Sequence, residues 1–373
     1  MAKLRIGIVG CGEIANEKHL PALAKEKRRV ELIGFCDLEP ERAQKTMHKF
    51  GDPGAALYTD YRELLQDETL GAVYVLTPNV SHAALSIAAL QAGKHVMCEK
   101  PMATTTVDAQ AMLLAARRTG KKLTVGYQNR FRADAQTLYK ACRAGDLGDI
   151  YFAKAHALRR RGVPTWGVFP DKSKQGGGPL IDLATHSLDL ALWMMDNYEP
   201  ALVMGAAFEK MRDKFEGNWF GPWDPKTFEV EDSAFGLVKM KNGATIFIES
   251  SWALNIARSR EAQVTLCGTE AGAELVGDAA APTSSAHAGN VLFNMVRYNQ
   301  QMELTASPVS SMIEAHLGGR SPSPSVGDAE QQAWLDAILN GVDLCVKPEQ
   351  AFVVTQILDA IYQSAAEGRA IHF

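Results

Sequence analysis

The chain of 373 residues lacks several features that would place it in other classes of protein. It has no uninterrupted apolar run long enough to cross a bilayer, so we expect no membrane-spanning segment. Its net charge is only −4 and its basic residues are scattered, which argues against nucleic acid or an anionic membrane as a partner. Its six cysteines are dispersed and include no C-x-x-C pair, which favours reduced thiols over a zinc site and predicts no metal. No signal peptide is expected before the first apolar segment at Leu4, and together these absences predict a cytoplasmic protein.

The composition and length indicate a globular protein with two domains. Hydrophobic residues make up 46% and charged residues 22% of the chain, and 373 residues exceed what one ordinary core holds. In the N-terminal third, short apolar segments alternate with helical patterns, which predicts parallel βαβ units in a doubly wound sheet. The predicted strands cover residues 4–9, 30–36, 72–76, 95–98 and 122–126, and the predicted helices cover residues 19–25, 40–50, 82–92 and 107–119.

A glycine-rich turn follows the first predicted strand. The run Gly10-Cys11-Gly12-Glu13-Ile14-Ala15 fits the pattern G-x-G-x-x-[GA]. Gly10 would permit the tight turn, Gly12 would let the backbone approach a pyrophosphate, and the helix N-terminus would supply amides to the phosphates. The pattern alone is common, but here it stands in a strand–turn–helix unit. We therefore predict a Rossmann dinucleotide-binding domain over residues 1–126, with cofactor contacts from Gly10, Gly12, Glu13 and Ile14.

Asp37 ends the second predicted strand, at the position that would receive the adenosine ribose. A carboxylate there accepts hydrogen bonds from the ribose hydroxyls and repels a 2′-phosphate, which favours NAD over NADP. Two alternatives stay open. Asp37 can serve as a turn residue before Pro40, and Arg42 nearby is compatible with NADP.

Two further groups of residues follow apolar strands at the carboxyl edge, where ligands bind in such sheets. Thr77, Pro78, Asn79 and His82 come after the strand at 72–76, and we predict that they lie near the cofactor. In local terms, Pro78 would end the strand and Asn79 or Ser81 would cap the next helix, and these roles are compatible with a place near the cofactor. Glu99-Lys100-Pro101 follows the strand at 95–98.

After residue 126 the pattern changes to longer alternating segments. Strands are predicted at residues 150–158, 201–209, 233–240, 244–251 and 263–267, and Asn242-Gly243 is a hairpin signal. These segments predict a second α+β domain over residues 127–373, with a large, mostly antiparallel sheet that keeps one face open for a partner. Residues 277–330 are expected to be irregular, and residues 328–340 and 350–367 to be helical.

The helix expected after Gly176-Gly177-Gly178 carries two chemical groups on one face. Pro179 suits its first position, and Asp182 and His186 are four residues apart, followed by Asp189 three residues later. Taken singly, Asp182 is an acid favoured by a helix N-terminus and His186 is an ordinary half-buried histidine. Their coincidence with the fingerprint and with Lys100 favours catalysis. The three glycines are also suited to a backbone that lies close to a ligand.

The fingerprint, the Glu-Lys-Pro motif and the Asp-x-x-x-His helix together resemble the Gfo/Idh/MocA family of oxidoreductases, over essentially the whole chain. The resemblance implies a Rossmann domain and a C-terminal domain whose open sheet builds homodimers or homotetramers. It also implies that Lys100, Asp182 and His186 are catalytic and that Glu99 and Lys100 lie at the cofactor.

A closer likeness connects four stretches to bacterial D-glucoside 3-dehydrogenases: ALRRRGVPTWGVF, KQGGGPLID, WDPKTFEVEDSAFG and ESSWALNI. It implies that NAD oxidises a carbohydrate at the C3 hydroxyl, giving a 3-keto sugar. His186 would take the hydroxyl proton and Lys100 would stabilise the alkoxide, while Asp182 would orient His186 or bind a neighbouring hydroxyl. The alternatives are glycoside cleavage by oxidation and elimination, and an NAD(H)-sensing regulator without catalysis.

The remaining candidates would hold the sugar. Aromatic rings stack on sugar faces, which favours this role for Trp166 and makes it an equal alternative to an oligomer contact for Trp223. Arg159 belongs to a basic run in which a solvated strand end or an ion pair is the competing role. His156 lies mid-strand and could face the sheet interior or the site. The other predicted sugar-binding residues are Gln128, Arg130 and Gln175.

Overall fold

The computed structural model describes residues 3–276, 290–295, 300–305 and 325–373. The chain forms two compact units. Unit 1 comprises Met1–Tyr127 and Gly327–Phe352, and unit 2 comprises Gln128–Val326 and Val353–Phe373.

Unit 1 is built on a six-stranded parallel sheet with the order β3-β2-β1-β4-β5-β6, which confirms the predicted doubly wound fold. Its order reverses between β1 and β4, the switch point at which such sheets bind ligands. The three-residue strand β3 was not predicted, because it is too short to show a pattern and all three residues are half-buried. The strands are β1 (Leu4–Val9), β2 (Val30–Cys36), β3 (Ala56–Tyr58), β4 (Ala72–Val75), β5 (His95–Cys98) and β6 (Leu123–Val125).

Short and long helices connect these strands. The helix after β1 begins with a π-helical turn and continues as one α-helical and one 3₁₀ turn. The helical segments are η1 (Ala15–His19), α1 (Leu20–Leu23), η2 (Ala24–Glu26), α2 (Pro40–Phe50), α3 (Tyr61–Leu65), η3 (Asn79–Ser81), α4 (His82–Gln91), α5 (Thr106–Thr119) and α10 (Val326–Asn340).

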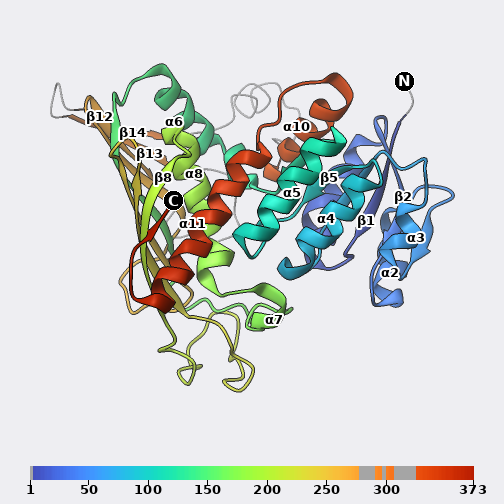
Figure 1. Cartoon of the computed structure of the whole chain (residues 1–373), viewed down its shortest axis with the longest axis horizontal. Coiled ribbons are helices and arrows are strands. Elements are labelled where there is room, and N and C mark those ends of the chain that lie inside the picture. The colour runs from blue at the N-terminus through green and yellow to red at the C-terminus, as the bar shows by residue number, and fades with distance from the viewer. Residues whose placement is uncertain (1–2, 277–289, 296–299, 306–324) are drawn as a thin grey trace, which may run out of the picture. The chain divides into compact units, whose positions relative to one another are not determined.

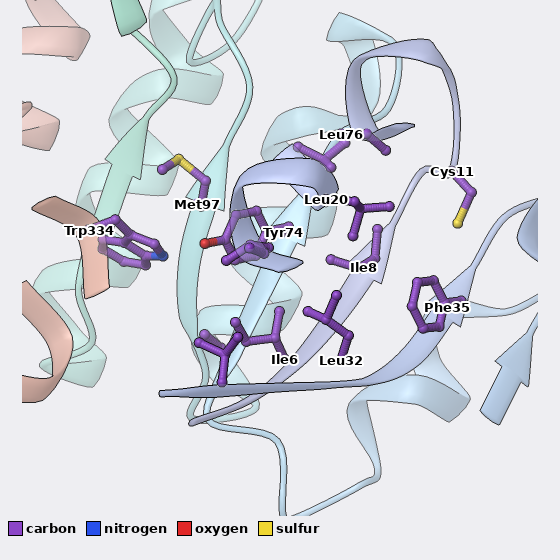
Figure 2. Close-up of a cluster of buried hydrophobic side chains, with 14 of the residues drawn as sticks. Ile6, Ile8, Cys11, Leu20, Leu32, Phe35, Tyr74, Leu76, Met97 and Trp334 are labelled. Atoms are coloured by element: carbon purple, nitrogen blue, oxygen red, sulfur yellow. The ribbon is translucent and has the colours of Figure 1, made fainter. Parts of the chain in front are cut away.

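The core of unit 1 explains one difference from the predicted domain boundary. Ile6, Ile8, Leu32 and Phe35 are almost completely buried on one side of the sheet, and burial of each such side chain stabilises the fold by about 1.5–3 kcal/mol. Trp334 of α10 belongs to the same cluster, beside Tyr74 and Met97 (Figure 2). Residues 327–352 therefore belong to unit 1, a difference from the second domain over residues 127–373 that the sequence predicts. The helical pattern of this segment was recognisable, but nothing in it says which core it packs on.

Unit 2 contains a nine-stranded sheet with the order β14-β13-β12-β11-β7-β10-β9-β8-β15. The β7–β10 pair is parallel and the other neighbours are antiparallel, as the prediction of a mostly antiparallel sheet requires. Its strands are β7 (Ile150–Leu158), β8 (Pro200–Phe208), β9 (Ser233–Met240), β10 (Thr245–Ser251), β11 (Arg260–Gly268), β12 (Ala271–Val276), β13 (Asn290–Met295), β14 (Gln300–Thr305) and β15 (Ile371–His372).

The expectation that residues 277–330 are irregular is wrong for two segments, because β13 and β14 pair with each other and extend the sheet beyond β12. Their sequences NVLFNM and QQMELT mix polar and apolar residues without regular alternation, so their strand character depends on pairing. The remainder of that segment lies largely outside the described residues.

Helices cover one face of the large sheet (Figure 1). Ile361 of α11 packs so closely on Gly205 and Gly236 that a Cβ at either position would lie under 3 Å from its atoms. On the opposite face, the paired residues Met204, Leu237 and Phe247 form an exposed apolar row. The helical segments are η4 (Gln128–Phe131), α6 (Ala133–Ala144), α7 (Lys172–Gln175), η5 (Leu180–Ala184), α8 (Thr185–Met195) and α11 (Pro348–Glu367). None of the helices in the described part of the chain has the length and apolar character needed to cross a membrane.

Candidate functional site

The loop after β1 has the geometry expected for binding a phosphate group. Gly10 has a φ of 95°, and a Cβ there would lie 2.5 Å from the Leu76 carbonyl oxygen, so only glycine fits. A Cβ on Gly12 would meet nothing within 4 Å, which leaves this part of the loop open to a ligand. Asn16 fixes the loop by donating hydrogen bonds to the carbonyl oxygens of Cys11 and Gly12, at 3.0 and 2.9 Å.

Asp37 is buried at the end of β2 and is joined to that loop. Its Oδ2 accepts a hydrogen bond from the Cys11 amide at 2.9 Å, and its Oδ1 accepts one from the Glu39 amide at 3.0 Å. Arg42 Nη1 lies 3.4 Å from Oδ1. Asp37 thus shapes both its own turn and the glycine loop, so a structural role accompanies the predicted ribose contact. Glu13 and Ile14 are exposed at the start of the helix.

The residues that follow β4 are held together by His82. This histidine is fully buried, and its Nδ1 and Nε2 each lie 2.8 Å from a backbone carbonyl oxygen, of Pro101 and Thr77 respectively. The Thr77 hydroxyl lies 2.6 Å from that of Ser81, and Asn79 begins the turn η3 after Pro78. The burial of His82 favours positioning over direct contact with a cofactor.

Glu99 is the centre of a buried polar cluster rather than an exposed ligand. Its Oε1 accepts hydrogen bonds from Lys18 Nζ at 2.6 Å and lies 2.8 Å from His19 Nε2, and its Oε2 accepts the Lys100 amide at 2.9 Å. Burial alone would raise the pKa of Glu99, but Lys18 and His19 hold that pKa well below its usual range. The carboxylate is therefore ionised and holds the backbone of Lys100, whose side chain is partly exposed.

In unit 2, a carboxylate of the protein caps the helix that carries Asp182 and His186. Glu231 accepts hydrogen bonds from the amides of Gly178 and Leu180, at 2.8 and 3.1 Å, and from the Tyr362 hydroxyl at 2.8 Å. A Cβ on Gly177 would lie 2.1 Å from the Tyr362 hydroxyl, and a Cβ on Gly178 would lie 2.1 Å from the Glu231 carbonyl oxygen. Gly177 and Gly178 are thus required by packing within the protein, which is a second reason for glycine beside the expected close approach to a ligand.

Asp182 lies in the π-helical turn η5 and His186 in the first turn of α8. Single π-helical turns occur frequently at functional sites. The indole of Trp252, which is fully buried, donates a hydrogen bond to Asp182 Oδ2 at 3.1 Å and fixes the carboxylate. Trp252 was not singled out from the sequence, and its place in the stretch ESSWALNI was the only available signal.

Two arginines predicted to bind sugar each form an ion pair with a carboxylate of the protein. Arg130 is fully buried and bonds Asp189 through Nε and Nη2, at 2.9 and 2.5 Å. Burial raises the pKa of Asp189, and Arg130 opposes that rise. Arg159 is bidentate to Glu261, with both distances 2.7 Å, which raises its pKa although burial alone would lower it. Neither placement supports a direct contact with substrate.

Some of the other predicted sugar-binding residues are buried within the protein, and others are partly exposed. His156 is buried between Glu249 Oε2, at 2.7 Å, and the Thr265 hydroxyl, at 3.1 Å, on the neighbouring strands. Trp223 is buried and donates a hydrogen bond to the Arg212 carbonyl at 2.8 Å, which favours a packing role. Trp166 is 39% exposed, Gln175 is buried at the end of α7, and Gln128 is half-buried in η4.

Comparison with known proteins identifies the family. Residues 4–127 match the NAD-binding Rossmann-fold domain of the Gfo/Idh/MocA oxidoreductase family, and residues 135–274 match the Gfo/Idh/MocA C-terminal domain. The D-glucoside 3-dehydrogenase of Escherichia coli (strain K12) is 34% identical over 368 residues, which cover 99% of this chain and 97% of that protein. The chain belongs to the Gfo/Idh/MocA family.

Solved structures show the same fold. An aldose-aldose oxidoreductase from Caulobacter crescentus, complexed with glycerol, superposes with a TM-score of 0.79 at 24% identity, with complete coverage of both chains. A levoglucosan dehydrogenase, in complex with NADH and levoglucosan, has a TM-score of 0.79 at 22% identity, covering 100% of this chain and 99% of that one.

Membership of the Gfo/Idh/MocA family makes the chain an oxidoreductase with NAD as its cofactor. The residues of unit 1 fit that group, since the open backbone at Gly12 and the helix N-terminus beside it suit a pyrophosphate. Within the described residues, no cluster of His, Cys, Asp or Glu is arranged to hold a metal ion.

Proposed function

We propose that the protein is an NAD-dependent sugar dehydrogenase that oxidises a secondary hydroxyl, at C3 of a glucoside or a related sugar. The observation that carries the proposal is the fixed Asp182 carboxylate one helical turn from His186, in a chain 34% identical to a D-glucoside 3-dehydrogenase over nearly its whole length. The levoglucosan dehydrogenase with the same fold also acts on a carbohydrate, as its name states.

The proposed reaction divides a proton and a hydride between two acceptors. His186 takes the hydroxyl proton as general base, and Lys100 donates a hydrogen bond to the oxygen as alkoxide character develops. When bound, NAD⁺ supplies the acceptor for the hydride that leaves the carbon. The Trp252 indole keeps Asp182 oriented, so that its carboxylate orients His186 or binds a neighbouring hydroxyl.

Trp166 belongs to this proposal as a platform for the sugar. Its ring lies edge-on to Phe220, with centroids 4.8 Å apart, and to Phe169, which in turn lies 6.4 Å from the Trp252 ring. The loop that carries Trp166 is fixed to the loop that carries Phe220. Asn218 accepts a hydrogen bond from the Val163 amide and donates one to the Val163 carbonyl oxygen, both at 2.9 Å. A partly exposed indole on a rigid base, connected through rings to the partner of Asp182, suits stacking on a sugar face.

The first experiment incubates the protein with NAD⁺ and a panel of glucosides, free hexoses and inositols, and follows the absorbance of reduced nicotinamide. We expect NADH with glucosides, and a loss of roughly a hundredfold or more in kcat for Lys100→Ala and His186→Ala. Lys49→Ala and His48→Ala, on the far end of α2, are the matched controls and should keep full activity.

Two other results of this incubation would support the alternative functions. Release of aglycone without net NADH would instead support cleavage by oxidation and elimination. Binding of NAD⁺ without turnover of any sugar would support a sensing role. Mass spectrometry of the product locates the ketone and so tests C3.

We also propose that the protein forms a homodimer or homotetramer in the cytoplasm through the open face of the large sheet. The exposed row Met204, Leu237 and Phe247 supports this assembly, because contiguous apolar side chains on an exposed face favour association. Light scattering on wild type and Leu237→Lys tests it, and a monomeric wild type would exclude it.

A further inference from the structure

The backbone around Lys100 is held by a side chain on each side. Glu99 Oε2 accepts the Lys100 amide at 2.9 Å, and His82 Nδ1 lies 2.8 Å from the Pro101 carbonyl oxygen. All four residues belong to unit 1. The position of Lys100 therefore depends on the residues that fix Glu99 and His82. The hydrogen bonds that fix Glu99 form the longer chain, which continues through His19.

The ionised Glu99 determines which nitrogen of His19 carries a proton. His19 Nε2 lies 2.8 Å from Glu99 Oε1, an atom that also accepts Lys18. Since a carboxylate only accepts hydrogen bonds, His19 must be protonated at Nε2. The remaining question is the state of Nδ1 on the other side of the ring.

Gln331 of α10 faces that second nitrogen. The Tyr74 hydroxyl donates to Gln331 Oε1 at 2.6 Å, which turns the amide nitrogen of Gln331 toward His19 Nδ1, 3.0 Å away. Burial keeps the pKa of Tyr74 well above its ordinary value, so its hydroxyl stays a donor. Because an amide N–H donates, Nδ1 accepts, and the ring is neutral with its proton on Nε2.

The donors thus point in one direction, from Tyr74 through Gln331 and His19 to Glu99. The charged and titratable groups around His19 are Glu99 at the end of β5, Lys18 on its own turn, Tyr74 on β4 and Glu330 on α10. Lys18 Nζ lies 2.6 Å from Glu99 and 3.1 Å from Glu330, and it balances part of their charge. Trp334, which is on α10 like Glu330, lies beside Tyr74 in Figure 2.

We propose that Gln331 is a positioning residue for Lys100, acting through a neutral His19 and the carboxylate of Glu99. The helix α10, which returns to unit 1 from more than 200 residues downstream of Lys100, is thereby part of what sets the geometry of the reactive lysine. The inference rests on the proposed function only for the catalytic role of Lys100.

The test uses Gln331→Glu, which places an acceptor against His19 Nδ1 and so favours a doubly protonated ring. Spectra of protein labelled with ¹⁵N-histidine report the protonation of His19, one of nine histidines, assigned by comparison with His19→Gln. Spectra of ¹⁵N-lysine protein report the Lys100 amide, assigned with Lys100→Arg. Gln332→Glu makes the same charge change on the exposed side of the same helix and is the matched control.

We expect wild type at pH 7 to show neutral His19 protonated at Nε2, and Gln331→Glu to show both nitrogens protonated with a shifted Lys100 amide. We also expect kcat to fall about tenfold, the value of about one hydrogen bond, while the KM for NAD⁺ stays within about threefold. Gln332→Glu should change none of these. Gln331→Met, which removes both hydrogen bonds at similar size, should also shift the Lys100 amide and lower kcat, and it replaces Gln331→Glu if that variant does not fold.

Three results would overturn the inference: a doubly protonated His19 in wild type, an unchanged Lys100 amide in Gln331→Glu, or an unchanged kcat despite a changed ring. The spectra need no substrate. If wild type oxidises no sugar, the proposed reaction fails while the spectra still decide the role of Gln331.

Discussion

Two helices of this protein begin at glycine-rich loops, and each loop has a buried carboxylate beside it. In unit 1 the carboxylate is Asp37, which accepts the amide of Cys11, in the loop before the helix. In unit 2 it is Glu231, which accepts the amides of Gly178 and Leu180 at the helix N-terminus itself. Around Gly12 a Cβ would meet nothing, whereas around Gly178 it would collide with the backbone of Glu231.

The difference shows how similar sequence signals lead to opposite uses of a helix N-terminus. An unfilled N-terminus with open backbone attracts an anion, as the cofactor's pyrophosphate requires. An N-terminus already occupied by Glu231 has no such capacity, and its rigidity instead fixes the turn that carries Asp182. Changes at the first loop should therefore affect the cofactor, and changes at the second should affect stability.

The broadest expected effect is at Gly10, where both stability and cofactor binding should be affected. Gly10→Ala places a Cβ 2.5 Å from the Leu76 carbonyl oxygen at a φ of 95°. We therefore expect the free energy of unfolding to fall by at least about 2 kcal/mol, and NAD⁺ binding to be lost as well. Gly12→Ala has no such collision, so its unfolding free energy should stay within about 0.5 kcal/mol of wild type while NAD⁺ binds at least about tenfold more weakly. Urea unfolding and calorimetric titration measure both. Equal destabilisation by the two substitutions would contradict the assignment.

At the second loop, Glu231→Ala leaves two amides and the Tyr362 hydroxyl without their acceptor, which should cost about 3 kcal/mol of stability. NAD⁺ affinity should not change. A weakened NAD⁺ affinity in a folded variant would remove the distinction between the loops.

Stability at this loop should also depend on pH. Burial raises the pKa of Glu231 above 4.5, although Gly178, Tyr362 and Leu180 donate hydrogen bonds to it. A carboxyl with a raised pKa in the folded state favours folding most below its unfolded pKa, and that contribution is lost as the pH rises through the folded pKa. The unfolding free energy of wild type minus that of Glu231→Gln should therefore decline as the pH rises from about 4, the lower end of the titration. A difference that rises with pH would contradict this sign.

This contrast also marks what the sequence could predict. Gly10, Gly12 and Asp37 follow a local pattern, so their arrangement was predictable, as were the helix with Asp182 and His186 and most of the strands. Arg130 with Asp189, and Gln331 with His19, are pairs separated by 59 and 312 positions, and no local period reveals such contacts. For the same reason a glycine triplet predicted an open backbone but could not show that Tyr362 would fill the space.

A smaller effect is expected at Asp37, where cofactor choice can be separated from loop shape. Asp37→Ala removes the charge that would oppose a 2′-phosphate, and we expect the ratio of NADP⁺ to NAD⁺ affinity to rise about tenfold. Arg42 would then face the phosphate, so adding Arg42→Ala should reverse part of the gain. Fluorescence titration with both cofactors measures the ratio. An unchanged ratio would leave Asp37 with its structural role alone.

The last comparison concerns chemical reactivity alone, at Cys11, which lies between the two glycines of the open loop and yet is buried. Burial and the neighbouring Asp37 raise the pKa of the Cys11 thiol to about 12. Because the thiolate is the reactive form, alkylation by iodoacetamide at pH 8 should be about a thousandfold slower than in the unfolded chain, as mass spectrometry of the labelled peptide can show. Fast labelling in the native state would mean that the loop opens on the Cys11 side as well. Slow labelling, combined with weak NAD⁺ binding in Gly12→Ala, would confine the cofactor's approach to the Gly12 side of the loop.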